Sequence, residues 1–367
     1  MLFGYPVSAT AENWLHECLR EILCSIHTSL KAAATLPAWP EIIPAQYRTR
    51  LEKRRGLEDR LNDYKKVLEK LSTAEQNRIL QALYDQNQID LLLSCQLNCE
   101  AIGDLPEAIH EPVKKLFEFG FELLTKLEIR DKHYKVIYDA APSHTCPFCG
   151  CENFDAPEAP REALDHYLAE SKYPFAASNL RNLVPMGNKC NSSYKRAEDI
   201  LIRKDGTRRK SFDPYSKSFD PYNCTRIRLS LKNSQPFAGT LTPIGQIPRW
   251  QIEFEPNTEE VITWDEVFHI RERYERDVLN PKFKSWLDDF KHWCKSAQIA
   301  PSSDKELMDG LNRYATLYEE MGISDRAFLK AAVFRMLHTH CQQGDQRLIS
   351  FIISIVNPGQ TNLRQAP

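Results

Sequence analysis

Residues Leu164 to Lys195 read LDHYLAESKYPFAASNLRNLVPMGNKCNSSYK and bring carboxylate, imidazole, amide and amino groups into one short segment. Asp165 and the amide oxygen of Asn191 are hard ligands of the kind that a phosphate-bound Mg²⁺ or Mn²⁺ ion prefers. His166 has a pKa suited to removing a proton from water near neutral pH. Lys195 follows Asn191 by one helical turn, which predicts that its ammonium group faces the phosphate. The segment therefore predicts a one-metal site for phosphodiester chemistry.

The same segment resembles the HNH (ββα-metal) nuclease family. In that motif an Asp-His pair ends the first strand, a middle Asn opens the second strand, and a final Asn lies in the following helix. Here these positions are Asp165-His166, Asn182 and Asn191, and the nine-residue spacing of the two asparagines is similar to that in the HNH domains of CRISPR effector nucleases. The resemblance implies that His166 is the general base and that Asp165 and Asn191 hold the metal. It also implies that Asn182 hydrogen-bonds within the loop after His166 and fixes it.

A cysteine pattern precedes this motif. The sequence CPFCG at residues 146–150 is typical of a zinc knuckle, because the glycine lets backbone amides turn toward the sulfur atoms. Many HNH proteins complete such a site with a second Cys-x-x-Cys before the final Asn, but this chain has Gly187 three residues before Cys190. Three arrangements fit: zinc held by Cys146, Cys149 and Cys190 with Cys151 or His144 as fourth ligand, an incomplete site that binds zinc weakly, or a knuckle without metal.

The composition is that of an ordinary globular protein. Of the 367 residues 42% are hydrophobic, and no apolar run approaches the roughly twenty residues of a membrane span. The start MLFGYPVSAT lacks the basic segment and apolar core of a signal peptide. Eleven cysteines are too sparse in a chain of this length for a secreted disulfide scaffold. We therefore expect a cytoplasmic protein with reduced thiols and no membrane partner.

The charge is unevenly distributed along the chain. A formal net charge of -2 gives no general attraction to nucleic acid, but residues 195–232 carry eleven basic against five acidic side chains. Because this excess follows the predicted metal site directly, we expect it to form a strip for the phosphate backbone of DNA or RNA. Within it, the Asp-Gly pair of RKDGTRRK predicts a basic hairpin. The basic residues are Lys195, Arg196, Arg203, Lys204, Arg208, Arg209, Lys210, Lys217, Arg226, Arg228 and Lys232.

Apolar residues recur at helical spacing through both flanks of the motif. The expected fold class is therefore α+β and mostly helical, with a central ββα-metal (HNH) unit between helical N- and C-terminal regions. We expect a helical domain at 1–131 for partner or substrate recognition and a nuclease core with its basic extension at 132–232. Residues 233–367 are expected to be mostly helical and to pack on the core.

Within the expected core, the apolar residues between Lys132 and Ser143 indicate a short strand. The two strands of the ββα unit are placed at residues 163–167 and 182–185, and its helix at residues 188–202. This arrangement would bring Asp165 and Asn191 together when the strands fold back on the helix.

Two classes of function fit this motif and its cysteine pattern. The resemblance implies a metal-dependent endonuclease that acts on nucleic acid, and we expect DNA as its substrate ahead of RNA. The segments LDHYLxxSKYP and NLVP look like those of bacterial anti-phage defence nucleases, including systems in which an ATPase partner controls the nuclease. The alternative is a zinc-knuckle nucleic-acid-binding or scaffold protein that does not cut, which the missing knuckle cysteine favours. A homing or restriction enzyme is a narrower option within the enzyme class.

Overall fold

The computed structural model describes residues 1–159, 164–196, 198–216, 227–239, 241–242, 245–299, 301 and 303–357. The chain divides into two compact units. The first comprises Met1, Phe3–Phe148 and Glu152–Asn223, and the second Leu2, Cys149–Cys151 and Cys224–Pro367. The boundaries expected at 131/132 and 232/233 differ from this division, because the N-terminal helices and most of the expected core belong to one unit.

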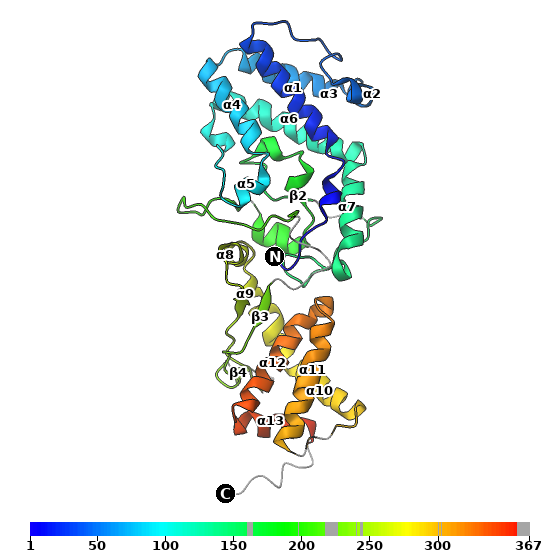
Figure 1. Ribbon diagram of the computed structural model, residues 1–367, viewed down its shortest axis with the longest axis vertical. Coiled ribbons are helices and arrows are strands. Elements are labelled where there is room, and N and C mark those ends of the chain that lie inside the picture. The colour runs from blue at the N-terminus through cyan, green and yellow to red at the C-terminus, as the bar shows by residue number, and fades with distance from the viewer. Residues whose placement is uncertain are drawn as a thin grey trace. The chain divides into compact units, whose positions relative to one another are not determined.

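Helices build the N-terminal part of the first unit, as the periodicity predicts. The side chains that recur at three and four in the first long helix, such as Leu15, Leu19 and Ile22, are all buried. Ser72 begins another helix with a capping box: its hydroxyl accepts from the Glu75 backbone N–H, and the Glu75 carboxylate accepts from the Ser72 N–H. The helices are α1 (Trp14–Lys31), α2 (Arg48–Leu51), α3 (Arg55–Leu68), α4 (Thr73–Asp85), α5 (Ile89–Leu93), α6 (Glu107–Lys126) and α7 (Ile129–Ala140) (Figure 1).

Helix α7 occupies the segment for which the sequence predicts a short strand, so that expectation is wrong. His133, Tyr134 and Ile137 are buried, and their spacing of three and four places them on one face of a helix. The His133 ring reaches the backbone oxygens of Ala9, 2.8 Å away, and of Leu183, 3.0 Å away. Burial of this face against distant segments decides the conformation, although the local apolar run favours a strand.

The two strands of the expected ββα unit pair with one another. β1 (Asp165–His166) and β2 (Leu183–Val184) are antiparallel, with Asp165 opposite Val184 and His166 opposite Leu183. Both are shorter than predicted, and residue 163 lies outside the described residues. The loop between them contains the 3₁₀ turns η5 (Pro174–Ala176) and η6 (Leu180–Asn182).

The helix after this hairpin is η7 (Lys189–Lys195), a π-helix. The prediction that it continues to Ile202 is wrong, because Arg196 has a φ of 45° and leaves the helical conformation. Beyond it, Ile202 pairs with Arg208 across the Asp-Gly turn, in which Gly206 has a φ of 85°. This pairing confirms the predicted hairpin. Two members of the basic run, Lys217 and Arg226, lie outside the described residues.

The second unit contains short antiparallel strand pairs and a set of helices (Figure 1). β3 pairs with β6, and both lie in stretches where polar and apolar residues alternate, residues 225–231 and 250–254. The mostly helical character predicted for the C-terminal third is confirmed. The elements are β3 (Arg228–Ser230), β4 (Leu241–Thr242), β5 (Gly245–Gln246), β6 (Glu253–Glu255), α8 (Glu259–Phe268), α9 (Ile270–Arg273), η8 (Tyr274–Leu279), α10 (Asn280–Ser296), α11 (Asp304–Glu320), α12 (Ala327–Gln342) and α13 (Gln346–Val356).

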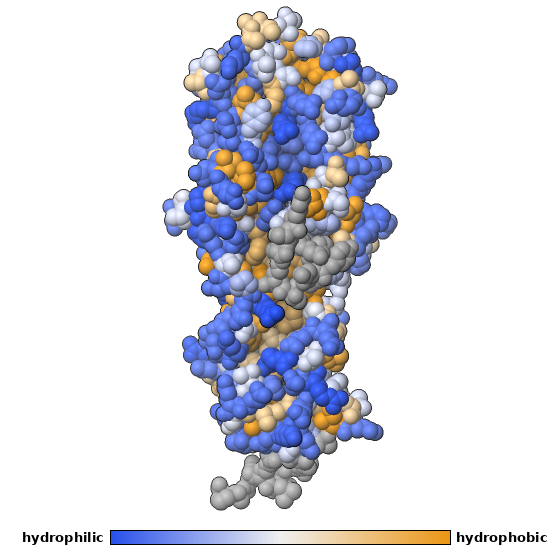
Figure 2. All heavy atoms as spheres, in the orientation of Figure 1, coloured by the Kyte–Doolittle hydropathy of each residue, from blue (hydrophilic) through white to orange (hydrophobic). Residues whose placement is uncertain are grey.

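Hydrophilic side chains cover most of the face drawn in Figure 2, and apolar ones are scattered between them. Among the described residues, every helix is too short or too polar to span a bilayer.

Candidate active site

The β1–β2 hairpin positions the Asp-His pair. The Asp165 side chain is 12% exposed and His166 is 9% exposed. Both groups are thus held in a largely dry environment at the edge of the first unit's core.

The hydrogen bonds of His166 define where its lone pair lies. Its Nε2 is 2.9 Å from the backbone oxygen of Ala177. A carbonyl only accepts hydrogen bonds, so Nε2 carries the proton and Nδ1 keeps the lone pair in the neutral ring. The Glu170 Oε2 atom lies 3.4 Å from Nδ1. The imidazole is therefore oriented with its basic nitrogen toward Glu170.

The pKa of His166 is lowered to about 4. Burial is the main cause, because it disfavours the imidazolium, and the nearby cations Lys195 and Arg130 act in the same direction. The hydrogen bond to Ala177 opposes them. The ring of Phe121, on α6, covers the imidazole with a centroid distance of 4.6 Å. His166 is thus neutral at physiological pH and able to accept a proton.

Asn182 ties together the two ends of the loop that follows His166. Its Oδ1 accepts a 2.7 Å hydrogen bond from the Leu168 N–H, and its Nδ2 donates to the backbone oxygens of Leu168 (3.0 Å) and Ala176 (3.3 Å). The side chain is fully buried. Since Ala176 precedes Ala177, the same bonds hold the carbonyl that orients His166. This is the hydrogen bonding that the resemblance implies for the middle asparagine.

Lys195 lies inside the core and does not face outward, whereas the predicted contact with a phosphate needs an accessible ammonium group. It is 0% exposed. Its Nζ lies 2.8 Å from Asp165 Oδ2 and donates a 2.7 Å hydrogen bond to the backbone oxygen of His166. Burial raises the pKa of Asp165 and the Lys195 ammonium opposes that rise. Lys195 therefore supports the Asp165 carboxylate from within the core.

Asn191 lies four residues before Lys195 in η7. This spacing places the two side chains on nearly the same side of the helix, and Lys195 reaches Asp165 on β1. The Asn191 side chain is partly exposed. One carboxylate and one amide oxygen form a hard donor set, and the chemistry of these donors fits Mg²⁺ or Mn²⁺. A cation there would share the carboxylate with Lys195, since a carboxylate has two oxygens and about four lone-pair sites.

The knuckle cysteines also come together. The sulfur atoms of Cys146, Cys149 and Cys190 lie within 4.8 Å of one another, and all three residues are buried. The Cys146 and Cys190 sulfurs are 3.9 Å apart. Two thiolates on a tetrahedral zinc, with Zn–S bonds of about 2.3 Å, lie roughly 3.8 Å apart. This set therefore fits three thiolate ligands of Zn²⁺.

The proposed fourth ligands are placed differently. The Cys151 backbone N–H donates to the Cys149 sulfur at 3.4 Å, and the Cys151 thiol also contacts the Cys149 thiol, but it does not belong to the three-sulfur cluster. The His144 ring stacks on Tyr138, with centroids 3.9 Å apart, and its Nδ1 bonds to the Tyr138 backbone oxygen. Neither residue completes the set here.

Glycine at position 187 also has a steric reason in this fold. A Cβ atom on Gly187 would lie 2.7 Å from Glu152 Cβ and 2.8 Å from Glu152 Oε2. The Glu152 carboxylate is itself held, because its Oε1 accepts from the Lys189 N–H at 2.9 Å. A cysteine at 187 would thus require Glu152 to move.

Sequence reasoning missed two contributors to the site, Glu170 and Phe121. Glu170 stands four residues after His166 and carries no distinguishing pattern, and Phe121 belongs to the apolar stripe of a helix distant in sequence. Burial raises the pKa of Glu170, and Glu118 and Asp165 act in the same direction.

Comparisons with protein-family models, curated proteins and solved structures gave no match.

Proposed function

We propose that this chain is a metal-dependent endonuclease of the HNH type that hydrolyses phosphodiester bonds of nucleic acid, with DNA as the expected substrate. The observation that carries the proposal is the state of His166. It is neutral, its Nε2–H donates to the Ala177 oxygen, and its Nδ1 lone pair faces the half-exposed Glu170 side chain. A histidine in that state can take a proton from an attacking water.

The roles of the other residues follow from their contacts. Asp165 and Asn191 would hold a Mg²⁺ or Mn²⁺ ion, which when bound supplies positive charge to the scissile phosphate and to the leaving oxygen. His166 accepts the proton of the attacking water at Nδ1, and the Glu170 carboxylate, 3.4 Å away, stabilises the resulting imidazolium. Lys195 keeps the Asp165 carboxylate ionised despite its burial. Asn182 holds the loop in which Ala177 orients the base.

The cellular role belongs to the same proposal. We place the enzyme as the effector of a bacterial anti-phage system in the cytoplasm, held in check by an ATPase or another regulatory protein. This placement rests on the resemblance of the LDHYL and NLVP segments alone. A structural zinc ion on Cys146, Cys149 and Cys190 would fix the base of the nuclease unit.

A second candidate function has one observation in its favour. The three buried cysteines could form a zinc knuckle in a protein that binds nucleic acid without cutting it. Such a protein would bind a polynucleotide equally well with or without the His166 imidazole.

Cleavage of supercoiled plasmid tests the proposal. Wild type with Mg²⁺ or Mn²⁺ is compared with His166→Ala, with an EDTA control, and with His292→Ala, which removes an exposed histidine of α10. We expect nicking or linearisation by wild type and His292→Ala only. Cleavage by His166→Ala at the wild-type rate would refute the role of His166. Metal-independent binding without any cleavage would favour the second candidate.

A further inference from the structure

A basic groove lies in the first unit just beyond η7. It encloses about 460 Å³, and its lining combines three sources of side chains. Lys172 comes from the loop after β1, Tyr194 and Arg196 from the end of η7, and Arg203 and Lys204 from the hairpin with the Asp-Gly turn. A volume of this size is in the range of about 300–1,000 Å³ that small-molecule sites occupy, so it can admit a nucleotide.

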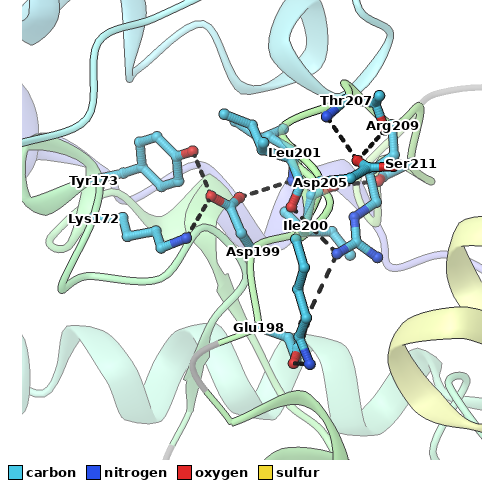
Figure 3. Close-up of polar contacts among 12 residues, drawn as sticks. Lys172, Tyr173, Glu198, Asp199, Ile200, Leu201, Asp205, Thr207, Arg209 and Ser211 are labelled. Carbon is cyan, nitrogen blue, oxygen red and sulfur yellow. Dashed lines mark hydrogen bonds and ion pairs between the residues drawn. The ribbon is translucent and has the colours of Figure 1, made fainter. Parts of the chain in front are cut away.

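The two acids of the groove are already engaged by the protein. Asp199 is 5% exposed, and its Oδ2 accepts hydrogen bonds from Lys172 Nζ (3.0 Å) and the Tyr173 hydroxyl (2.9 Å), which point at it in Figure 3. Its Oδ1 accepts from the Leu201 N–H. Because these donors satisfy it from inside, Asp199 fixes the floor of the groove and adds little repulsion toward an anion.

Glu198 has ion pairs with two basic residues. Its carboxylate lies 3.1 Å from Lys204 Nζ and 3.9 Å from Arg209, a contact that Figure 3 also draws. The Lys204 side chain is 88% exposed, so its pair with Glu198 is weak and can be exchanged for a phosphate. With Arg209 remaining beside Glu198, the groove presents an excess of positive charge to solvent.

The backbone of Arg196 singles it out. Its φ of 45° and ψ of −126° lie in a region that residues other than glycine rarely adopt. The side chain is exposed, and its Nε donates to the Ser192 oxygen at 3.2 Å. A glycine would adopt this conformation without strain. An arginine at this position is explained if its guanidinium binds a ligand in the groove.

The groove adjoins the candidate active site along the chain. Lys195 lies between Tyr194 and Arg196, and its ammonium contacts Asp165 and the backbone of His166. A nucleic-acid strand whose scissile phosphate lies near Asp165 and His166 would therefore reach the groove with a neighbouring nucleotide.

We propose that this groove binds the substrate strand beside the cleaved bond. Arg196, Arg203 and Lys204 contact its phosphates, and the half-buried ring of Tyr194 stacks on a base. This inference rests on the proposed function, because it assigns the groove to the same substrate. It commits to a polynucleotide strand rather than to a free nucleotide or another anion.

Binding is measured without cleavage, so that the two proposals can fail separately. Fluorescence anisotropy follows a 5′-labelled 20-nucleotide single strand, and the matching duplex, with the His166→Ala protein in EDTA. The variants Arg196→Gly and Lys204→Ala, alone and combined, are added to that background. The matched control is Lys31→Ala with Lys53→Ala, two exposed lysines elsewhere in the first unit.

We expect the double variant to weaken binding about tenfold and to reduce the slope of log K against log salt by roughly 1.4, because each lost phosphate contact contributes about 0.7 for a single strand. The Lys31/Lys53 control should match the parent protein. Tyr194→Leu should weaken binding about tenfold, and Tyr194→Phe should not, because stacking needs the ring and not the hydroxyl. Arg196→Gly should retain or raise the melting temperature, which separates lost binding from lost folding.

Equal affinity of the groove variants and the control would overturn the inference, whether or not the wild type cleaves DNA. Weaker binding by the groove variants, with no cleavage by wild type under any metal, would keep strand binding by the groove and count against the nuclease. Should wild type cleave, groove variants in an otherwise intact protein are expected to raise KM about tenfold with kcat unchanged. Binding of the duplex but not of the single strand would overturn the stacking role of Tyr194.

Discussion

Replacing Lys195 with methionine tests whether this residue supports the site from within or contacts substrate. Methionine keeps a similar apolar length and removes the ammonium. In the folded protein that ammonium is fully buried, 2.8 Å from Asp165 Oδ2 and 2.7 Å from the His166 oxygen. The substitution therefore leaves a largely buried carboxylate without its cation and a backbone oxygen without its donor.

The size of the effect follows from the cost of breaking a buried ion pair. Removing one partner of such a pair typically costs about 3–5 kcal/mol. Asp165 has an alternative to remaining charged, because burial already raises its pKa and loss of Lys195 raises it further. Protonation then limits the loss, so we expect about 3 kcal/mol near pH 7. The double variant Asp165→Asn with Lys195→Met should recover most of this loss, because no buried charge remains.

Hydrogen–deuterium exchange read by mass spectrometry measures this effect locally. Amides in residues 164–185 should exchange more than a hundredfold faster in Lys195→Met, since about 1.4 kcal/mol corresponds to a factor of ten. Peptides from α11 and α12 serve as the internal reference. Lys189→Met, an exposed lysine at the start of the same π-helix, is the matched control and should exchange like wild type.

One outcome would refute this reasoning. If Lys195→Met exchanged like wild type but bound the labelled oligonucleotide more weakly, Lys195 would contact the phosphate and the ion pair with Asp165 would be wrong. Recovery of protection in the double variant is the second requirement, since a purely steric effect of methionine would persist there.

Three further predictions concern neighbouring groups. Asn182→Ala removes three buried hydrogen bonds and should destabilise the first unit by about 3 kcal/mol in urea unfolding. Backbone amides of residues 168–177 should exchange with solvent faster, and an unchanged exchange rate would contradict the role of Asn182 in this loop. The pKa of His166 is about 4 in the folded chain and 6.5 in the unfolded chain, so its contribution to the free energy of unfolding is complete above pH 6.5 and falls by about 3 kcal/mol as the pH drops through 4. The His166→Gln variant should lose this part of the pH dependence. Purified protein should contain about one zinc ion per chain by elemental analysis. Cys190→Ser should lose this zinc, whereas the control Cys294→Ser, at a buried cysteine of α10, should retain it.

Parts of this structure follow from local sequence because local chemistry suffices to form them. The Asp-Gly turn near Gly206 and the strand pair β1–β2 lie close to the predicted places, and the Ser72 capping box joins residues only three apart. Caps and turns depend on a few adjacent residues, whose backbone preferences are intrinsic. The Asp-His pair and the two asparagines were identifiable for the same reason, since their types and spacing are visible in one segment.

The remaining features depend on partners that are distant along the chain. The α7 segment is helical because its buried face meets Ala9 and Leu183. The orientation of His166 depends on Ala177 and on Phe121 from α6, and the burial of Lys195 depends on where β1 lies. The sequence by itself thus determined which groups are available for chemistry. Only the tertiary structure decided which are dry, paired or open to a ligand, because burial and pairing are set by segments that meet in space.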